Sequence, residues 1–344
     1  MNIKARKMKF TDIVGQERVK NMLLRAIESN RLPHAMLFSG IPGTGKKTMA
    51  KAMAMRLNCL SPSPEGGCGT CKFCRQISHG NFPDFLVIGV EKGKVSKISI
   101  DQIRQIYKRV SFSPIARYRI VVIDQAEDMT DEATNSFLKL LEEPPERNIF
   151  ILNTTEPLNL LPTVVSRCQN IKFSPIPSSL IADWLIKNRS LDKDTAIVLS
   201  KMCNGSIGRA IELMESGYLE RRDQWISLLI KIPAMNRQGI YEIMEKDPST
   251  KEEVIEMLIT WNSWLRDILV IKETKNKELL INRDLSHTAE KVAERYKKDN
   301  LLKAIDLIQK AEKDLYKNRN ISLVLKNTLL KLHEYLEAGM HNSI

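Results

Sequence analysis

The stretch that decides the fold is the strand-like Ala35-Met-Leu-Phe38, the loop Gly40-Ile-Pro-Gly-Thr-Gly45-Lys46-Lys47-Thr48 and the helix start Met49-Ala-Lys-Ala-Met-Ala54. A strand, a glycine-rich loop and a helix follow one another in the order that a phosphate-binding loop requires. The glycines let backbone N–H groups turn toward phosphate oxygens, the helix N-terminus adds the positive end of its dipole, and Lys46 reaches the outer phosphates. The alternative is a chance glycine-rich turn, which this order of elements disfavours. The predicted nucleotide-binding residues here are Gly40, Gly43, Thr44, Gly45, Lys46, Lys47 and Thr48.

The residue after the loop lysine departs from this motif. A Ser or Thr usually stands there and ligates Mg²⁺ through its hydroxyl, whereas this chain has Lys47. An ammonium group cannot ligate a cation, and Thr48, one residue further on, points about 100° away around the helix axis. We therefore expect ATP or ADP to bind through Lys46 and the loop backbone, and Lys47 argues against Mg²⁺ coordination.

The second half of the site is expected at the end of a later strand. The run Arg119-Ile-Val-Val-Ile-Asp124-Gln125 is apolar and ends in an acid, and Asp124 would hold a metal ion through water. Active ATPases of this layout usually have Glu at the next position, where it polarises the attacking water. Gln125 orients water but accepts a proton very poorly, so we expect slow hydrolysis or none. In the alternative interpretation, Asp124 only caps a following helix.

Four cysteines crowd together directly after the loop helix, at Cys59, Cys68, Cys71 and Cys74. In a reducing compartment such spacings indicate a metal site rather than disulfides, and four thiolates can close a tetrahedron around Zn²⁺. Because four protein ligands leave no open position, we expect a structural zinc module over residues 59–74. Catalytic zinc and a redox cluster are the alternatives. The isolated Cys168 and Cys203 are interpreted as small buried residues.

Around these motifs, the first half of the chain alternates short apolar runs with longer helix-like stretches. This pattern is typical of an α/β fold, with a mostly parallel sheet covered by helices on both faces. Because each run is apolar throughout, the strands are expected to be buried on both sides. The expected strands are 35–38, 85–88, 120–123 and 149–152, and the expected helices are about 16–29, 46–58, 99–109 and 130–142.

The second half reads differently. After the segment Phe173-Ser-Pro-Ile-Pro177 the strand-like runs stop, and the pattern is helical to the end, with breaks near Gly205-Ser-Ile-Gly208 and around Pro233 or Pro248. Two amphipathic stripes, Leu301 to Leu315 and Leu325 to Leu336, predict helices of a packed bundle.

Composition and charge narrow the class of protein. The chain has 344 residues, enough for two or three domains, with 43% hydrophobic residues and a net charge of +12. No apolar run is long enough to span a membrane and the start lacks a secretory signal, so we expect a cytoplasmic globular protein with no membrane partner. Residues 1–175 carry 26 basic and 16 acidic side chains. Such an excess suits DNA or nucleotide phosphates as well as a merely solvated face.

Several further segments resemble one known family. They are Phe10-Thr-Asp-Ile-Val-Gly-Gln16, Phe137-Leu-Lys-Leu-Leu-Glu-Glu-Pro-Pro145, Leu152-Asn-Thr-Thr155, Ser166-Arg167-Cys168 and the stretch Asn318 to Leu332. Together with the loop and the cysteines, they resemble the clamp-loader branch of the AAA+ ATPases over nearly the whole chain. The resemblance implies an AAA+ P-loop domain over 1–175, a small helical lid over 176–240 and an all-α collar for oligomerisation over 241–344.

The resemblance also implies roles for single residues. In that family the arginine of Ser-Arg-Cys projects into the nucleotide site of a neighbouring subunit, so Arg167 is expected to act in trans on the transferring phosphate. Local pairing of Arg167 with Glu156 or Asp124 is the alternative. Thr154 or Thr155 is expected at the position that senses the outer phosphate, and Thr155 is taken as the site residue. The lid arginine of active motor subunits falls on Gly208, with Arg209 one place later.

These departures favour a non-hydrolysing subunit of a clamp loader, which would help place a sliding clamp on primed DNA. Its expected partners are motor subunits, the clamp-opening subunit and, in the assembly, the clamp and the DNA. An ATP-hydrolysing motor subunit is the first alternative. A nucleic-acid-binding zinc protein without a working nucleotide site is the second, motivated by the basic first half.

Overall fold

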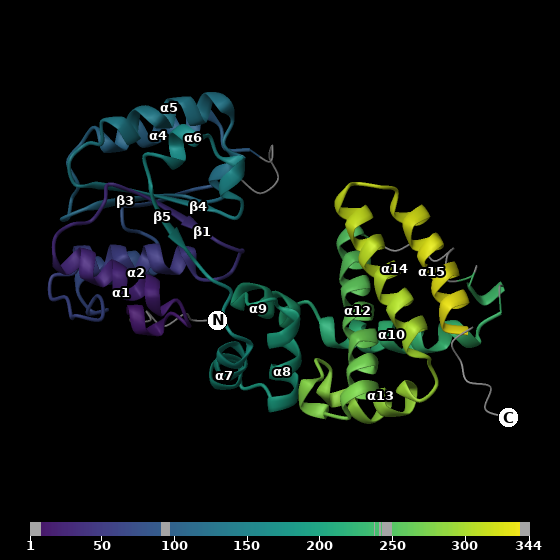
Figure 1. Ribbon diagram of the computed structural model, residues 1–344. Helices are drawn as coiled ribbons and strands as arrows, with labels where there is room; N and C mark the ends of the chain where they lie inside the picture. The colour runs from purple at the N-terminus through teal and green to yellow at the C-terminus, as the bar shows by residue number, and fades with distance from the viewer. Residues whose placement is uncertain (1–7, 91–96, 237, 241, 243–249, 338–344) are drawn as a thin grey trace. The chain divides into compact units, whose positions relative to one another are not determined.

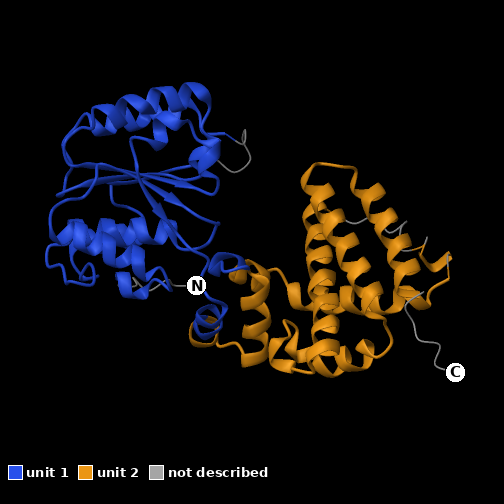
Figure 2. Ribbon diagram, viewed as in Figure 1, with its two compact units in different colours: residues 1–184, 204–209 blue, residues 185–203, 210–344 orange. Residues whose placement is uncertain are grey.

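The computed structural model describes residues 8–90, 97–236, 238–240, 242 and 250–337 (Figure 1). The chain divides into two compact units, which Figure 2 colours separately. The first comprises residues 1–184 and 204–209, and the second comprises 185–203 and 210–344. The domain boundaries predicted at 175 and 240 stay predictions. Pro248 lies outside the described residues.

The first unit is built on a parallel five-stranded sheet with the order β2-β3-β4-β1-β5. The four strands expected from the sequence are confirmed, and the parallel register sets their carboxyl ends side by side. The strands are β1 (Ala35–Ser39), β2 (Phe85–Ile88), β3 (Arg119–Ile123), β4 (Asn148–Thr154) and β5 (Gln169–Lys172).

The two edge strands are where the expectation was wrong. β2 was expected to be buried on both faces, but it lies at an edge and is only half-buried, with Val87 45% exposed. β5 was missed because an edge strand needs little apolar surface. Only Ile171 of β5 is buried, so the sequence has no apolar run there from which the strand could be predicted.

Helices cover both faces of the sheet (Figure 1). On one face, α1 and α2 pack against Met36 and Phe38 of β1, and on the other α4 and α5 pack against its Leu37. The alternation along β1 follows from the two-residue period of a strand. The helices of this unit are α1 (Glu17–Glu28), α2 (Lys46–Asn58), α3 (Lys72–His79), α4 (Ile100–Val110), α5 (Asp131–Glu142) and α6 (Pro162–Val165), followed by α7 (Ser178–Arg189), which continues into the second unit.

The second unit is helical throughout its described residues. Trp261 and Trp264 of its longest helix are fully buried, and the predicted leucine stripe of α15 faces the core through Leu325, Leu329 and Leu332. Its helices are α8 (Lys193–Met202), α9 (Ile207–Glu215, which begins in the first unit), α10 (Tyr218–Lys231), α12 (Lys251–Thr274), α13 (Ser286–Ala293), α14 (Lys298–Tyr316) and α15 (Ile321–Glu337).

Short 3-10 turns complete the described chain. They are η1 (Phe10–Asp12), η2 (Ala126–Asp128), η3 (Pro157–Asn159), η4 (Ile232–Ala234), η5 (Lys277–Leu279) and η6 (Arg283–Leu285). Among the described helices, none combines the length and the apolar character that crossing a bilayer would demand.

Candidate functional site

Helix α2 connects two clusters of candidate functional side chains. Its first residue, Lys46, follows the glycine-rich loop, and Cys59 caps its other end. The helix packs on the sheet in the core that it shares with α1 (Figure 1). Because most of its residues are buried, α2 places both clusters on a rigid element.

The loop has a conformation that its glycines make possible. Gly40, Gly43 and Gly45 have φ angles of +145°, +72° and +97°. A Cβ on Gly40 would lie 2.4 Å from the carbonyl oxygen of Phe173, and one on Gly43 would lie 2.2 Å from Ser206 Oγ. Both positions therefore need glycine for the close approach of another segment as well as for the backbone angle.

The segment before α9 lies directly against the loop. The N–H of Gly208 donates to the carbonyl oxygen of Gly43 at 3.2 Å, and Ser206 Oγ accepts from the N–H of Arg209 at 3.0 Å. Gly208 is the position at which the family resemblance places the lid arginine of active motor subunits. Its lack of a side chain lets the two backbones approach, since a Cβ there would lie 2.9 Å from Gly43 Cα.

Lys46 is held inside the loop. Its side chain is 8% exposed, and its ammonium donates to the carbonyl oxygens of Gly40 and of Ile41, the latter at 3.0 Å. Burial lowers the pKa of Lys46, while Asp124 and Glu127 act in the opposite direction. The neighbouring Thr44 is buried with its hydroxyl on the Ile41 carbonyl, and Thr48 is half-buried in the first turn of α2.

Asp124 comes next to this loop at the end of β3, and both of its oxygens have partners. Lys47 Nζ lies 2.8 Å from Oδ2, and Asn153 Nδ2 donates to Oδ1 at 3.0 Å. Asn153 was not singled out from the sequence. The signal that could have found it is its place near the carboxyl end of the next strand, because parallel strands bring these ends together. The group that the sequence excluded as a metal ligand thus pairs with the expected metal-binding acid.

Thr155 binds a second acid that the sequence analysis missed. Its N–H and its hydroxyl both donate to Glu127 Oε1, at 2.8 and 2.7 Å. Burial acts to raise the pKa of Glu127, but hydrogen bonds, chiefly those from Thr155, together outweigh it and hold that pKa below its usual value. Gln125 is exposed at the start of η2, with a left-handed backbone. Two buried oxygens of this cluster, Glu127 Oε2 and Asn153 Oδ1, have no hydrogen-bond partner among the described residues.

Arg167 lies apart from the loop, just after α6. Its guanidinium contacts Glu142 Oε1 at 2.7 Å and the carbonyl oxygen of Thr163 at 3.0 Å. The adjacent Val164 and Cys168 pack on the face of the sheet that α4 and α5 cover, opposite to α2. Local pairing thus occurs with Glu142 rather than with Glu156 or Asp124. The arginine side chain keeps 36% of its surface exposed.

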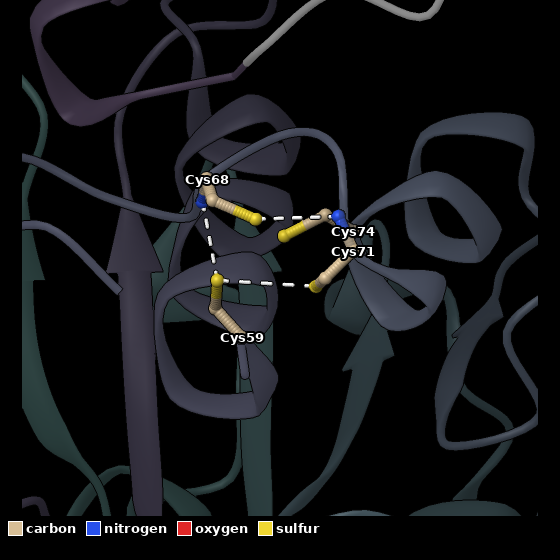
Figure 3. A group of neighbouring side chains, drawn as sticks. All are labelled: Cys59, Cys68, Cys71 and Cys74. Atoms are coloured by element: carbon tan, nitrogen blue, oxygen red, sulfur yellow. Dashed lines mark hydrogen bonds between the residues drawn. The ribbon is translucent and has the colours of Figure 1, made fainter. Parts of the chain in front are cut away.

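The four cysteines come together at the other end of α2 (Figure 3). Their sulfur atoms all lie within 4.8 Å of one another, with Cys59 Sγ 3.9 Å from Cys71 Sγ, and all four are free thiols. Four sulfurs at about 2.3 Å from a tetrahedral Zn²⁺ would be roughly 3.8 Å apart. The cluster therefore fits a four-coordinate metal ion closely.

Hydrogen bonds favour the thiolate form of Cys68, whereas burial raises the pKa of the Cys59 and Cys74 thiols. The N–H groups of Cys68 and Cys71 point at Cys59 Sγ and Cys68 Sγ, at 3.1 and 3.3 Å. A hydrogen bond from the Thr70 side chain, with others from the backbone, lowers the pKa of Cys68 to about 5. The short helix α3, which begins directly after Cys71, was not expected from the sequence. A Cβ on Gly67 would lie 2.8 Å from Cys74 Sγ, so this glycine makes room for the cluster.

Comparison with known proteins agrees with the motifs. The family described as DNA polymerase III, delta subunit, matches residues 15–177, and the family of its C-terminal part matches 216–334. The chain is 29% identical to DNA polymerase III subunit delta' of Bacillus subtilis, over 93% of this chain and 96% of that protein. It is 28% identical to subunit tau of the same organism, over 90% of this chain and 59% of tau.

Among solved structures, a DNA polymerase III gamma subunit-related protein of Thermotoga maritima is similar, with 18% identity and a TM-score of 0.40, over 92% of this chain and 99% of that one. The two family matches lie in different units and together cover most of the chain, and the relatives named beside them come from the same replication complex. The chain belongs to the family of DNA polymerase III clamp-loader subunits.

Proposed function

We propose that the chain is a delta-prime-like subunit of a bacterial clamp loader that does not itself hydrolyse ATP. The observation that carries this proposal is the ion pair between Lys47 and Asp124. An acid that should hold Mg²⁺ through water is instead neutralised by an ammonium of the chain. With Gln125 in place of a water-activating acid, the site offers neither a free acid for the metal ion nor the base that hydrolysis needs.

The site retains the groups that bind phosphate. The glycine-rich loop, the start of α2 and Lys46 supply backbone donors, a helix dipole and a cation at one place. We therefore propose that ATP or ADP binds here, with Thr155 near the outer phosphate. When bound, the nucleotide would link the loop to β3 and β4, whose ends lie side by side.

Arg167 is proposed to serve a neighbouring subunit. Its anchoring to Glu142 ties it to α5, while a third of its side chain stays open to solvent. An arginine held in this way is positioned before a partner arrives, and in trans it would neutralise charge on the phosphoryl group being transferred. Motor subunits of the gamma or tau type are the proposed recipients, and a clamp-opening delta-type subunit, the sliding clamp and primed DNA are the further partners.

The four-cysteine cluster is proposed to hold structural Zn²⁺. All four coordination positions would be taken by Cys59, Cys68, Cys71 and Cys74, which leaves none for water or substrate. The metal would therefore tie the segment 59–74 to the end of α2 and take no part in a reaction. We place the assembled complex in the cytoplasm.

The test is ATP turnover by the purified zinc-loaded chain, alone and mixed with motor and clamp-opening subunits, with and without primed DNA. We expect the chain alone to be inactive and the mixture to be active. Arg167→Ala should lower turnover at the neighbouring motor site by roughly 10³-fold. The total ATP turnover of the mixture should therefore fall by at least the fraction that this site contributes. Arg104→Ala is the matched control, because Arg104 is also an exposed arginine in a local ion pair.

Three results would contradict the proposal. Motor-like turnover by the isolated chain would favour the motor alternative, to which the similarity with subunit tau also points. Equal activity of mixtures made with Arg167→Ala and with Arg104→Ala would remove the role in trans. Binding of DNA by the isolated chain with a steep salt dependence, in a chain that joins no complex, would favour the nucleic-acid-binding alternative.

A further inference from the structure

Both oxygens of the Asp124 carboxylate have a partner in the chain itself. Lys47 Nζ lies 2.8 Å from one oxygen and Asn153 Nδ2 lies 3.0 Å from the other. In phosphate-loop sites of this kind a strand-end acid holds the divalent cation that offsets the phosphate charge. Here the positive charge beside that acid is covalently attached to the first turn of α2.

The ammonium of Lys47 is placed to contact a ligand as well as Asp124. Its side chain is 58% exposed, so the ion pair leaves donors of the three-donor ammonium open to solvent. Lys46, the preceding residue, is the one expected to reach the outer phosphates. Two cations at adjacent positions, one of them braced by Asp124, thus stand at the start of the helix that follows the glycine-rich loop.

A separate observation indicates that the site is built to receive another group. Asn153 is 1% exposed, and its Oδ1 has no hydrogen-bond partner among the residues that the structure describes. The nearby Glu127 Oε2 also lacks a hydrogen-bond partner among these residues. Buried oxygens without a donor are costly, and they are normally satisfied by a ligand or by ordered water. Both oxygens belong to the cluster around the pair of Lys47 and Asp124, so donors of a ligand or of its hydrating water would satisfy them there.

We propose that the Lys47 ammonium replaces Mg²⁺ at this site, so that the chain binds a nucleoside di- or triphosphate as the metal-free anion. This inference rests on the proposed nucleotide binding and adds the form in which the nucleotide is taken. A tethered ammonium supplies one positive charge at a fixed place and needs no dissolved cation. It carries half the charge of Mg²⁺ and cannot coordinate a phosphate oxygen and a water together, which agrees with a site that holds nucleotide without hydrolysing it.

The test is the affinity of the full, zinc-loaded chain for ADP and for ATP, measured by calorimetry in buffer with Mg²⁺ and in buffer that was freed of divalent cations before the protein was added. For the wild type we expect the Kd values with and without Mg²⁺ to agree within about twofold. Loss of one charge-assisted hydrogen bond to the nucleotide would by comparison raise Kd about tenfold. Lys47→Thr removes the ammonium and restores the hydroxyl. This variant should bind about tenfold or more weakly without Mg²⁺ and should recover affinity when Mg²⁺ is added.

Lys298→Thr is the matched control. Lys298 is also an exposed lysine in the first turn of a helix, and it pairs with Glu273 at 2.9 Å in the other unit. This variant should bind nucleotide as the wild type does in both buffers. Lys47→Met, which keeps most of the length of the side chain and offers no oxygen ligand for Mg²⁺, should lose affinity in both. Thermal melting of each variant checks that it folds.

Three outcomes overturn the inference. The wild type could require Mg²⁺, with Kd falling more than about tenfold when the cation is added. Nucleotide could bind to Lys47→Thr but not to the wild type, which would show that Lys47 closes the site. Finally, neither the wild type nor Lys47→Thr could bind nucleotide, which would also contradict the proposed nucleotide binding by this chain. None of these bears on Arg167, because the turnover of the mixture reports on the neighbour's site, so the two proposals fail separately.

Discussion

The two ends of α2 carry clusters of opposite character. At its start, each charged group has a partner in the chain, since Lys46 is bonded to loop carbonyls, Lys47 to Asp124, and Glu127 to Thr155 through one of its two oxygens. At its other end, four sulfurs lie within 4.8 Å of one another, and as thiolates they would repel unless a cation stood between them. The first cluster keeps its shape without a ligand, whereas the second is a site whose geometry calls for a metal ion. Ligand removal should therefore have very different consequences at the two ends.

Metal removal should have the largest effect. Stripping the metal with a strong chelator, or replacing a ligand by Cys71→Ser, should destabilise the first unit by several kcal/mol, because binding energy of a structural metal is folding energy. The four cysteines pack in the same apolar cluster as α2, so the loss reaches the core. Urea unfolding with parallel measurement of zinc content checks this.

Cys168→Ala is the control for that experiment. Cys168 lies outside the cluster, and burial raises the pKa of its thiol to about 11, which keeps it protonated and a poor ligand. The zinc content of the Cys168→Ala variant should equal that of the wild type. A metal-free protein that unfolds at the same urea concentration as the loaded one would contradict the contrast between the two ends.

Gly43→Ala should have an intermediate effect. The added Cβ would lie 2.2 Å from Ser206 Oγ and 2.9 Å from the backbone of Gly208, at a φ of +72°. We expect the free energy of unfolding to fall by about 1–3 kcal/mol, because of backbone strain together with displacement of the segment before α9. Gly80→Ala, at a φ of +78° with nothing within 4 Å, has the strain without the clash. Equal losses in the two variants, measured by chemical unfolding, would show that the contact with Ser206 and Gly208 contributes nothing.

Asp124→Asn should have the smallest effect on stability. The pair that it breaks is partly exposed, with 58% of the Lys47 side chain and 23% of the Asp124 side chain open to solvent, so we expect a loss below about 1 kcal/mol. Asp84→Asn offers the contrast, since Asp84 and Arg119 form a buried pair at 2.8 Å and breaking such a pair costs about 3–5 kcal/mol. A loss at Asp124 as large as that at Asp84 would mean that the loop end depends on its ion pair for folding.

The motifs of the candidate site could be found from the sequence because they are local. The loop residues Gly40 to Thr48 form one continuous stretch, and the four cysteines fall within a short segment, so spacing alone identified both. The strand that ends in Asp124 was recognised in the same way, from its apolar run. Asn153 and Glu127 were missed because their importance comes from neighbours in space, on β4 and on η2.

The sheet shows the same division. Strands β1, β3 and β4 lie inside the sheet and needed continuous apolar runs, which made them visible. The edge strand β5 has only Ile171 buried, and its membership of the sheet depends on backbone pairing with β1, which no side-chain pattern records.

The sequence by itself determined the kind of fold, the glycine-rich loop after the first strand, the cysteine cluster and the absence of a metal-binding hydroxyl directly after Lys46. It did so because backbone conformation, burial period and ligand chemistry are properties of short segments. Only the tertiary structure decided that Lys47 pairs with Asp124, that Arg167 is braced by Glu142, and that Gly208 approaches Gly43. Those contacts join residues far apart in the chain, and their partners are selected by the packing of strands and helices, which no local pattern encodes.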